Sequence, residues 1–191
     1  MTNTPNFIEI YDNALSHEQC RQIITEFELD KISQEAGKCG DGVVENVKKS
    51  TDIIHYLNDG SLASSIINFA LAQPLDHYKK KYPEIDKIAT WSFHPDYHVQ
   101  RYRPNEGYFE PHCEVMGTGY SANRVLVWMY YLNDVNNGGT RFTNFDIDIE
   151  AKEGRLVLWA PYWTHVHHGI ISSTKTKYIA TGWYSFVDQW Q

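Results

Sequence analysis

The second half of the sequence, from Ile88 onward, constrains the fold most. Short runs rich in Val, Ile, Tyr, Trp and Thr follow one another there, separated by the turn-forming stretches NEG, NDVNNGG, KEG and HHG. Many short strands at such spacing are typical of a β-barrel or a jelly roll. We therefore predict a β-sheet core in this half of the chain.

The first half predicts one short strand and two helices. FIEIYDN at 7–13 alternates before a polar turn, and Ser16 and Gln19 have the spacing of a capping box that starts a helix over 16–29. A second helix is predicted over 60–82, kinked or split at Pro74. Its apolar positions, which we expect to pack against the sheet, are Leu62, Ile66, Ile67, Phe69, Ala70 and Leu75.

Length and composition fit a single domain over residues 1–191. A chain of 191 residues, 42% of them hydrophobic, fills one core and leaves no surplus for a second. The segment 31–50 is rich in Gly, Lys and Glu, so we predict a mobile surface loop, with a lid as the second interpretation. The fold class expected is α+β, mostly β with flanking helices.

Charge and hydropathy exclude several classes of partner. The formal net charge of -7 disfavours general attraction to nucleic acid, and no apolar run approaches the roughly 18 residues that span a bilayer. The N-terminal stretch lacks a basic region followed by an apolar one, and the three cysteines form no C-x-x-C pair. We expect a soluble, cytoplasmic protein with no nucleic-acid or membrane partner; its oligomeric state stays open.

A cluster of metal-binding residue types begins at PHCEV, 111–115. His112 and Glu114 would share one face of an extended strand, and Cys113 would point the other way. A further histidine from HVHHG, 165–169, would complete a set of two imidazoles and one carboxylate. That set binds non-haem iron(II) and leaves three coordination positions open for a co-substrate and dioxygen. A dicarboxylic co-substrate would also need a cation for its far carboxylate.

Two histidine–lysine pairs compete for these roles. His165 precedes Lys175 by ten residues, and His167 precedes Lys177 by ten, while His168 would face the opposite side. Lys175 lies in the polar turn SSTKT, whereas Lys177 opens the strand-like run KYIATGWYSF. A lysine at the start of a buried strand needs an anionic partner, and one in a turn does not. We therefore favour His167 with Lys177, and place His165 in the surroundings of the ligands.

The order of these motifs resembles the prolyl 4-hydroxylase-like branch of the iron(II)- and 2-oxoglutarate-dependent dioxygenases. The stretches that carry the resemblance are FIEIYDNALSHEQC, QRYRPNEGYFEPHCE, MYYLNDVNNGGTRF, HHG and KYIATGW. Together they extend from about residue 6 to residue 187. The resemblance implies a double-stranded β-helix, a cupin-like jelly roll packed against N-terminal helices, with the metal near one mouth.

The resemblance also implies a metal-ligand set. His112, Glu114 and His167 match the iron ligands, since the family's distal histidine lies two residues before a glycine, here Gly169. The family usually has aspartate at the position of Glu114, and the extra methylene moves the carboxylate by more than an ångström. We expect metal binding to survive this change.

Further positions match the family's co-substrate and substrate sites. Lys177 matches the residue that pairs with the far carboxylate of 2-oxoglutarate, and Tyr102 and Thr140 align with positions that hydrogen-bond the same molecule. Arg124 matches a place where an arginine faces the substrate, and we take it as the catalytic candidate. The cofactor and co-substrates implied are iron(II), 2-oxoglutarate and dioxygen, with ascorbate as a further candidate.

The function implied is hydroxylation of an unactivated C–H bond in a prolyl residue of a peptide or protein. Free proline or another small amino acid is the alternative substrate. A non-catalytic jelly-roll metal-binding module and a zinc hydrolase are alternatives of another class, but the chain has no H-E-x-x-H motif and a hydrolase gives Lys177 no role. A nucleic-acid demethylase is disfavoured by the acidic balance.

Other residues of these chemical types are expected to be structural. His94 and His98 are predicted at a strand surface or turn, and Cys113 as a small core residue. The aromatic residues expected in the core or pocket wall are Tyr130, Trp159, Trp163 and Trp183. A hairpin turn is predicted from Asn133, Asp134, Gly138 and Gly139.

Overall fold

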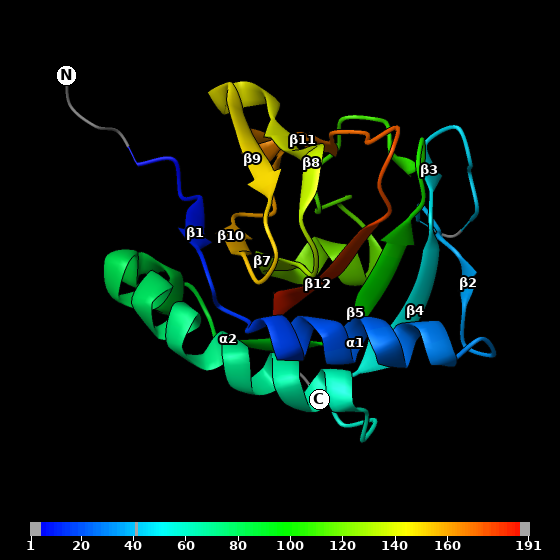
Figure 1. Ribbon diagram of the computed structural model, residues 1–191. Coiled ribbons are helices and arrows are strands. Elements are labelled where there is room, and N and C mark those ends of the chain that lie inside the picture. Colours follow the sequence, from blue (N-terminus) through cyan, green and yellow to red (C-terminus); the bar gives the residue numbers. More distant parts are fainter. Residues whose placement is uncertain (1–4, 41, 188–191) are drawn as a thin grey trace.

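The computed structural model describes residues 5–40 and 42–187 of the chain. Two helices, α1 (His17–Leu29) and α2 (Leu62–Lys81), lie beneath a large β-sheet, and a smaller sheet lies above it (Figure 1). The strands are β1 (Glu9–Tyr11), β2 (Glu35–Ala36), β3 (Lys48–Lys49), β4 (Thr51–Tyr56), β5 (Trp91–Tyr102), β6 (Gly107–Tyr108), β7 (Arg124–Tyr131), β8 (Val135–Phe142), β9 (Ile147–Ala151), β10 (Leu156–Trp159), β11 (His167–Gly169) and β12 (Lys177–Phe186).

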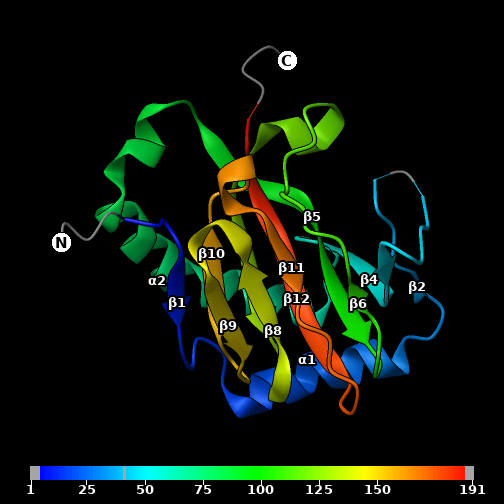
Figure 2. The same ribbon diagram turned by 90° about the horizontal axis from the view of Figure 1, so that it is seen from above.

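The strand order is that of a jelly roll. The large sheet runs β1-β10-β7-β12-β5-β4-β2, the small sheet β11-β8-β9, and β3 and β6 form a separate ribbon. Paired strands are antiparallel, and most neighbours in the large sheet are distant in sequence. The small sheet crosses in front of the large one when the molecule is seen from above (Figure 2). The expected jelly-roll core packed against N-terminal helices is confirmed.

Residues of β7 alternate between two hydrophobic layers, which explains why this strand has no polar face. Successive side chains of a strand point to opposite sides. The side chains that pack toward the helices are Leu126, Trp128 and Tyr130. The side chains that lie between the two sheets are Val127, Met129 and Tyr131. The large sheet is therefore covered on both faces, and the site must lie between the sheets or at their rim.

Helix α1 begins where its capping residues predict. The Ser16 side chain accepts from the Gln19 backbone N–H, and the Gln19 side chain accepts from the Ser16 N–H, so the capping box is complete. Cys20, Ile23 and Phe27 are buried along one side of the helix. The predicted helix is confirmed.

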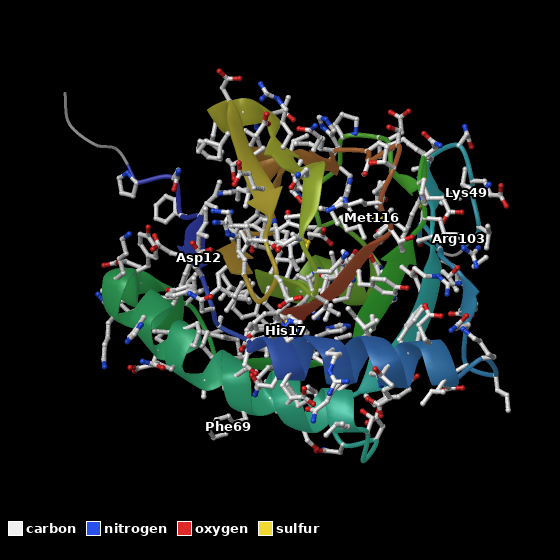
Figure 3. The ribbon with its side chains drawn as sticks, in the orientation of Figure 1. Asp12, His17, Lys49, Phe69, Arg103 and Met116 are labelled. Carbon is white, nitrogen blue, oxygen red and sulfur yellow. The ribbon has the colours of Figure 1, made fainter. Side chains whose placement is uncertain are left out.

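Helix α2 is continuous through Pro74 and is not split. Its buried face is formed by Ala63, Ser64, Ile66, Ile67, Leu71, Pro74 and Tyr78. The expectation that Leu62 and Phe69 pack against the sheet is wrong, because these residues are 47% and 83% exposed. The Phe69 side chain projects from the outer side of the helix (Figure 3). No helix in the described part of the chain is long and apolar enough to cross a membrane.

The segment 31–50 is tied to the sheets near both of its ends. β2 pairs with β4, and β3 pairs with β6. Lys48 and Asp52 form an ion pair of 2.7 Å in which both side chains are about 5% exposed or less. These contacts hold β3 beside β6, which carries Tyr108.

The residues expected to form a hairpin turn do not form one. β7 belongs to the large sheet and β8 to the small one, so the chain passes between sheets at 132–134. Gly138 and Gly139 lie within β8 itself. A Cβ on Gly139 would lie 1.8 Å from the carbonyl oxygen of Ile149, so glycine lets β9 approach β8 closely.

This close approach predicts a large effect of a single methyl group. We expect Gly139→Ala to lower the free energy of unfolding by about 2–4 kcal/mol, because β8 and β9 must separate to admit the methyl group. Chemical denaturation measures the difference. Gly42→Ala is the matched control, since no atom lies within 4 Å of its added Cβ. Equal stability of the two variants would contradict the close packing.

Candidate metal centre and co-substrate pocket

Backbone hydrogen bonds bring the two halves of the candidate metal centre together. The N–H of His112 donates to the carbonyl of His167, and the N–H of His167 donates to that of His112, both at 2.9 Å. This pairing is an isolated bridge and not part of a longer strand at His112. Glu114 is held by a bond from its N–H to the Pro161 carbonyl at 2.9 Å. The potential ligand atoms of His112, Glu114 and His167 all lie within 4.8 Å of one another.

Hydrogen bonds to backbone carbonyls fix which ring nitrogens face the centre. His112 Nδ1 lies 3.0 Å from the Glu110 carbonyl, and His167 Nδ1 lies 2.8 Å from the His165 carbonyl. A carbonyl oxygen only accepts, so Nδ1 carries a hydrogen in both rings, and Nε2 is the nitrogen that could bind a metal. The Nε2 atoms of His112 and His167 lie 3.7 and 3.3 Å from Glu114 Oε1. Two imidazole nitrogens and one carboxylate oxygen therefore converge, which is a donor set that iron(II) accepts.

The second oxygen of Glu114 is bound on the opposite side. Trp183 Nε1–H donates to Oε2 at 2.9 Å, and the Arg124 guanidinium lies 3.3 Å from the same oxygen. Burial raises the pKa of Glu114, but the His112 and His167 imidazoles lower it by more, so the net pKa lies well below the ordinary value. Glu114 is thus an ionised carboxylate with one oxygen held by donors and the other facing the histidines. The bond from Trp183 was not predicted from the sequence.

Aromatic rings restrict the two imidazoles further. Tyr108 stacks on His112 with ring centres 3.6 Å apart and an angle of 17° between the planes. Trp159 meets His167 edge to face at 5.1 Å. From the sequence, the tyrosines around 102 to 108 were expected in the wall of the substrate groove. The stacking of Tyr108 on His112 was not predicted, because the pairing of β6 with β3 that positions Tyr108 joins residues far apart in the chain.

Lys177 and Lys175 lie in very different environments. Lys175 is exposed, whereas Lys177 is 6% exposed. Burial lowers the pKa of Lys177 to about 8. Its ammonium contacts the Ile170 carbonyl at 3.4 Å and lies 5.3 Å from the centre of the Tyr102 ring. Among the residues that the structure describes, no carboxylate lies within ion-pair distance of this ammonium.

Two buried hydroxyl groups lie on the wall near Lys177. Tyr131 Oη donates to Thr140 Oγ1 at 2.6 Å, which leaves the Thr140 hydroxyl hydrogen free to donate elsewhere. Tyr102 Oη donates to Gln100 Oε1 at 2.7 Å, so its hydrogen is engaged within the protein. Neither Tyr131 nor Gln100 was singled out from the sequence, since their role depends on cross-strand neighbours.

Arg124 lies closer to the metal centre than expected. Its guanidinium donates to the Glu114 backbone carbonyl at 2.8 Å and covers the Trp183 ring at 3.6 Å. The resemblance implied a substrate-facing arginine, and the structure shows one whose guanidinium contacts Glu114 and Trp183.

Some of the remaining histidines and aromatic residues lie where the sequence predicted them, and others do not. The His165 ring is buried and turns away from the centre toward the Asn6 carbonyl, 2.8 Å from Nε2, while its own backbone carbonyl orients His167. His168 is only half-buried. His94 is a buried strand residue, so its expected place at a surface or turn is wrong. Trp163 is 74% exposed, which contradicts its expected place in the core or pocket wall.

One cavity of about 570 Å³ collects the predicted site residues. Its wall includes His112, Glu114, His167, Lys177, Tyr102, Thr140 and Arg124, and also Cys113, Trp159 and Trp183. His165, His168 and Lys175 are not on this wall. The size is typical of a pocket for small molecules or for a side chain together with a small molecule.

Comparison with known protein families gives a match over the part of the chain that contains the candidate metal-binding residues. Residues 97–185 match the model of the 2OG-Fe(II) oxygenase superfamily. No curated protein matches the chain.

Three solved structures share the fold over nearly the whole chain. A viral collagen prolyl hydroxylase from Paramecium bursaria Chlorella virus-1, in complex with 2OG, is 17% identical, with 98% of this chain and 100% of that chain covered and a TM-score of 0.70. A prolyl-4-hydroxylase of Pseudomonas putida is 15% identical, with 94% and 93% covered and a TM-score of 0.72. A prolyl hydroxylase of Trichoplax adhaerens, in complex with a hypoxia inducible factor peptide fragment, is 18% identical, with 96% and 84% covered and a TM-score of 0.71.

The matched segment contains the triad and Lys177, and the fold agrees over the rest of the chain. Residues 97–185 are therefore similar to the 2OG-Fe(II) oxygenase superfamily, and the chain has the fold of solved prolyl hydroxylases.

Proposed function

We propose that the protein uses iron(II), 2-oxoglutarate and dioxygen to hydroxylate a prolyl residue in a peptide or protein. One observation carries the proposal: the triad and a buried lysine without an acidic partner among the described residues line the same cavity. The triad would bind a metal, and the buried ammonium of Lys177 needs an anion as its partner. A dicarboxylate that chelates the metal at one end satisfies both requirements.

The triad would hold the metal through His112 Nε2, His167 Nε2 and Glu114 Oε1. The donor set fits iron(II), because both imidazoles are oriented by carbonyl oxygens and directed at one ionised carboxylate oxygen. When bound, iron(II) with 2-oxoglutarate and dioxygen supplies the oxidation that converts a C–H bond to C–OH while 2-oxoglutarate is converted to succinate and carbon dioxide. Trp183 and Arg124 keep Oε2 engaged, so Glu114 presents a single oxygen.

The co-substrate would lie along the wall that Lys177 and Thr140 share. The ammonium of Lys177 would pair with the far carboxylate, and the free hydroxyl hydrogen of Thr140 would donate to the same group. Tyr102 would contribute mainly through its ring face toward Lys177, because its hydroxyl donates to Gln100. Burial of this wall excludes water from the anion and strengthens each of these contacts.

The prolyl substrate is supported by the proteins that share the fold. One acts as a collagen prolyl hydroxylase, and another binds a hypoxia inducible factor peptide. A zinc hydrolase would leave Lys177 without a role, so we do not favour it.

The first test is anaerobic titration of the apo-protein with iron(II) and 2-oxoglutarate. We expect the weak visible charge-transfer band of the chelate to develop, to be lost in His167→Ala, and to persist in His165→Ala, because the His165 ring points away from the centre. Metal binding without the band would contradict the proposed chelate. The reverse result for the two variants would move the ligand to His165.

Trp183 provides a test of how Glu114 is oriented. We expect Trp183→Phe to weaken binding of cobalt(II), a spectroscopic substitute for iron(II), by about tenfold, because the donor to Oε2 is lost while a ring remains under Arg124. The matched control is Trp128→Phe, since Trp128 Nε1 has no hydrogen-bond partner among the described residues and its side chain lies in the layer that faces the helices. Equal affinity in the two variants would show that the bond to Glu114 is unimportant for the metal.

The two lysines give a paired test of the co-substrate site. We expect Lys177→Ala to raise the dissociation constant of 2-oxoglutarate by about 100-fold, as expected for loss of a buried charge-assisted hydrogen bond of about 3 kcal/mol. Lys175→Ala should change it less than twofold, because Lys175 is exposed and off the cavity wall. Isothermal calorimetry with manganese(II) in place of iron measures both. Similar effects would remove Lys177 from its proposed role.

The pKa of Lys177 predicts a pH dependence. Only the protonated amine attracts a carboxylate, and burial lowers this pKa to about 8, so 2-oxoglutarate affinity should be constant below that value and fall as pH rises through 8. Calorimetry between pH 7 and about 9.5 should show a decline approaching tenfold per pH unit. Lys177→Met should show weak binding that varies little over the same range; a pH profile unchanged by this substitution would assign the titration to another group.

A further inference from the structure

The cavity extends along β5 well beyond the region of Lys177. Alternate residues of this strand face the cavity, and they are, from the Lys177 side, Tyr102, Gln100, His98, Asp96 and His94. Tyr102 is paired with Lys177, and His98 with Thr181. Asp96 lies six positions along the strand from Tyr102, which corresponds to roughly 20 Å. We call the part lined by His94, Asp96 and Arg124 the distal end of the cavity.

Asp96 and Glu114 are the two carboxylates on the described cavity wall, and they differ in their bonding. Both oxygens of Glu114 are engaged by the histidines, Trp183 and Arg124. Among the residues that the structure describes, the one ion-pair partner of Asp96 within 4.0 Å is His94, whose Nε2 lies 3.8 Å from Oδ1, beyond hydrogen-bond distance. The Asp96 side chain is 34% exposed, so it is accessible from the cavity.

Neighbouring groups do not neutralise Asp96 by direct contact. His94 Nδ1 is bonded to Ser185 Oγ at 2.8 Å, and burial lowers the pKa of His94, which favours the neutral ring. Arg124 supplies the other positive charge at this end, but its guanidinium bonds to Glu114 and lies on Trp183. It makes no ion pair with Asp96 within 4.0 Å in the described part of the chain. The negative charge of Asp96 is therefore available to a ligand.

We propose that Asp96 binds a cationic group of the substrate, adjacent to the residue that is hydroxylated. The inference rests on the proposed function and adds a substrate class to it. A partly enclosed carboxylate with its lone pairs unused gains most from a charged N–H donor, because such hydrogen bonds are about twice as strong as neutral ones. The cation is an ammonium or guanidinium, and it can be the α-amino group of a free amino acid or N-terminal residue, or the side chain of a lysine or arginine near the target proline.

Binding of matched probes to the anaerobic complex with iron(II) and 2-oxoglutarate tests the proposal. L-Proline is compared with N-acetyl-L-proline, and a short blocked proline peptide that carries lysine is compared with the same peptide carrying norleucine. We expect the cationic member of at least one pair to bind at least tenfold more tightly. The first pair identifies an α-amino group as the source of charge, and the second identifies a side chain.

Substitution of Asp96 connects this preference to the distal end. Asp96→Asn should reduce the preference to less than threefold and leave the iron(II)–2-oxoglutarate band unchanged, whereas Asp76→Asn, on the exposed side of α2, should leave both unchanged. Equal binding of charged and neutral probes, binding of neither, or a preference that survives Asp96→Asn would overturn the proposal. Loss of the band in the unsubstituted protein would instead reject the proposed function.

Discussion

The candidate centre depends on a pair of backbone hydrogen bonds between His112 and His167. These bonds join a loop that follows β6 to the start of β11, which lies in a different part of the chain. Because the bonds involve the two candidate ligand residues themselves, the two imidazoles are held at the spacing of adjacent strands. Carbonyls of Glu110 and His165 then set the orientation of each ring. Backbone geometry, and not side-chain contact alone, thus assembles the donor set.

Periodicity and motif spacing predicted much of this arrangement. The capping box at Ser16 and the strand-like run at Lys177 lie in local sequence, so the helix start and the burial of that lysine could be anticipated. The choice between two histidine–lysine pairs followed from burial alone, and the cavity contains the favoured pair. The assignment of individual roles remains a prediction that the experiments above address.

The partners of the ligands could not be predicted in the same way. Trp183 reaches Glu114 from 69 residues away in the chain, and Tyr108 reaches His112 because β6 pairs with β3. Such contacts depend on sheet register and side-chain direction, which periodicity does not define. The errors have the same origin: Gly138 and Gly139 were taken for turn residues, although glycine serves there to bring two strands close. Phe69 fitted a helical pattern, but the rotation of α2 on the sheet decides which side is covered.

Strand β12 carries several of these functions at once. Lys177, Thr181 and Trp183 all lie on its cavity side, so the proposed co-substrate anchor, the cavity wall and the donor to Glu114 share one register. A one-residue insertion or deletion near the start of this strand would turn its side chains to the opposite face. Insertions and deletions would therefore disrupt β12, whereas the loops around the entrance of the cavity can accept them. Divergence in this protein would then alter which molecule enters the cavity much more readily than it alters the chemistry performed there.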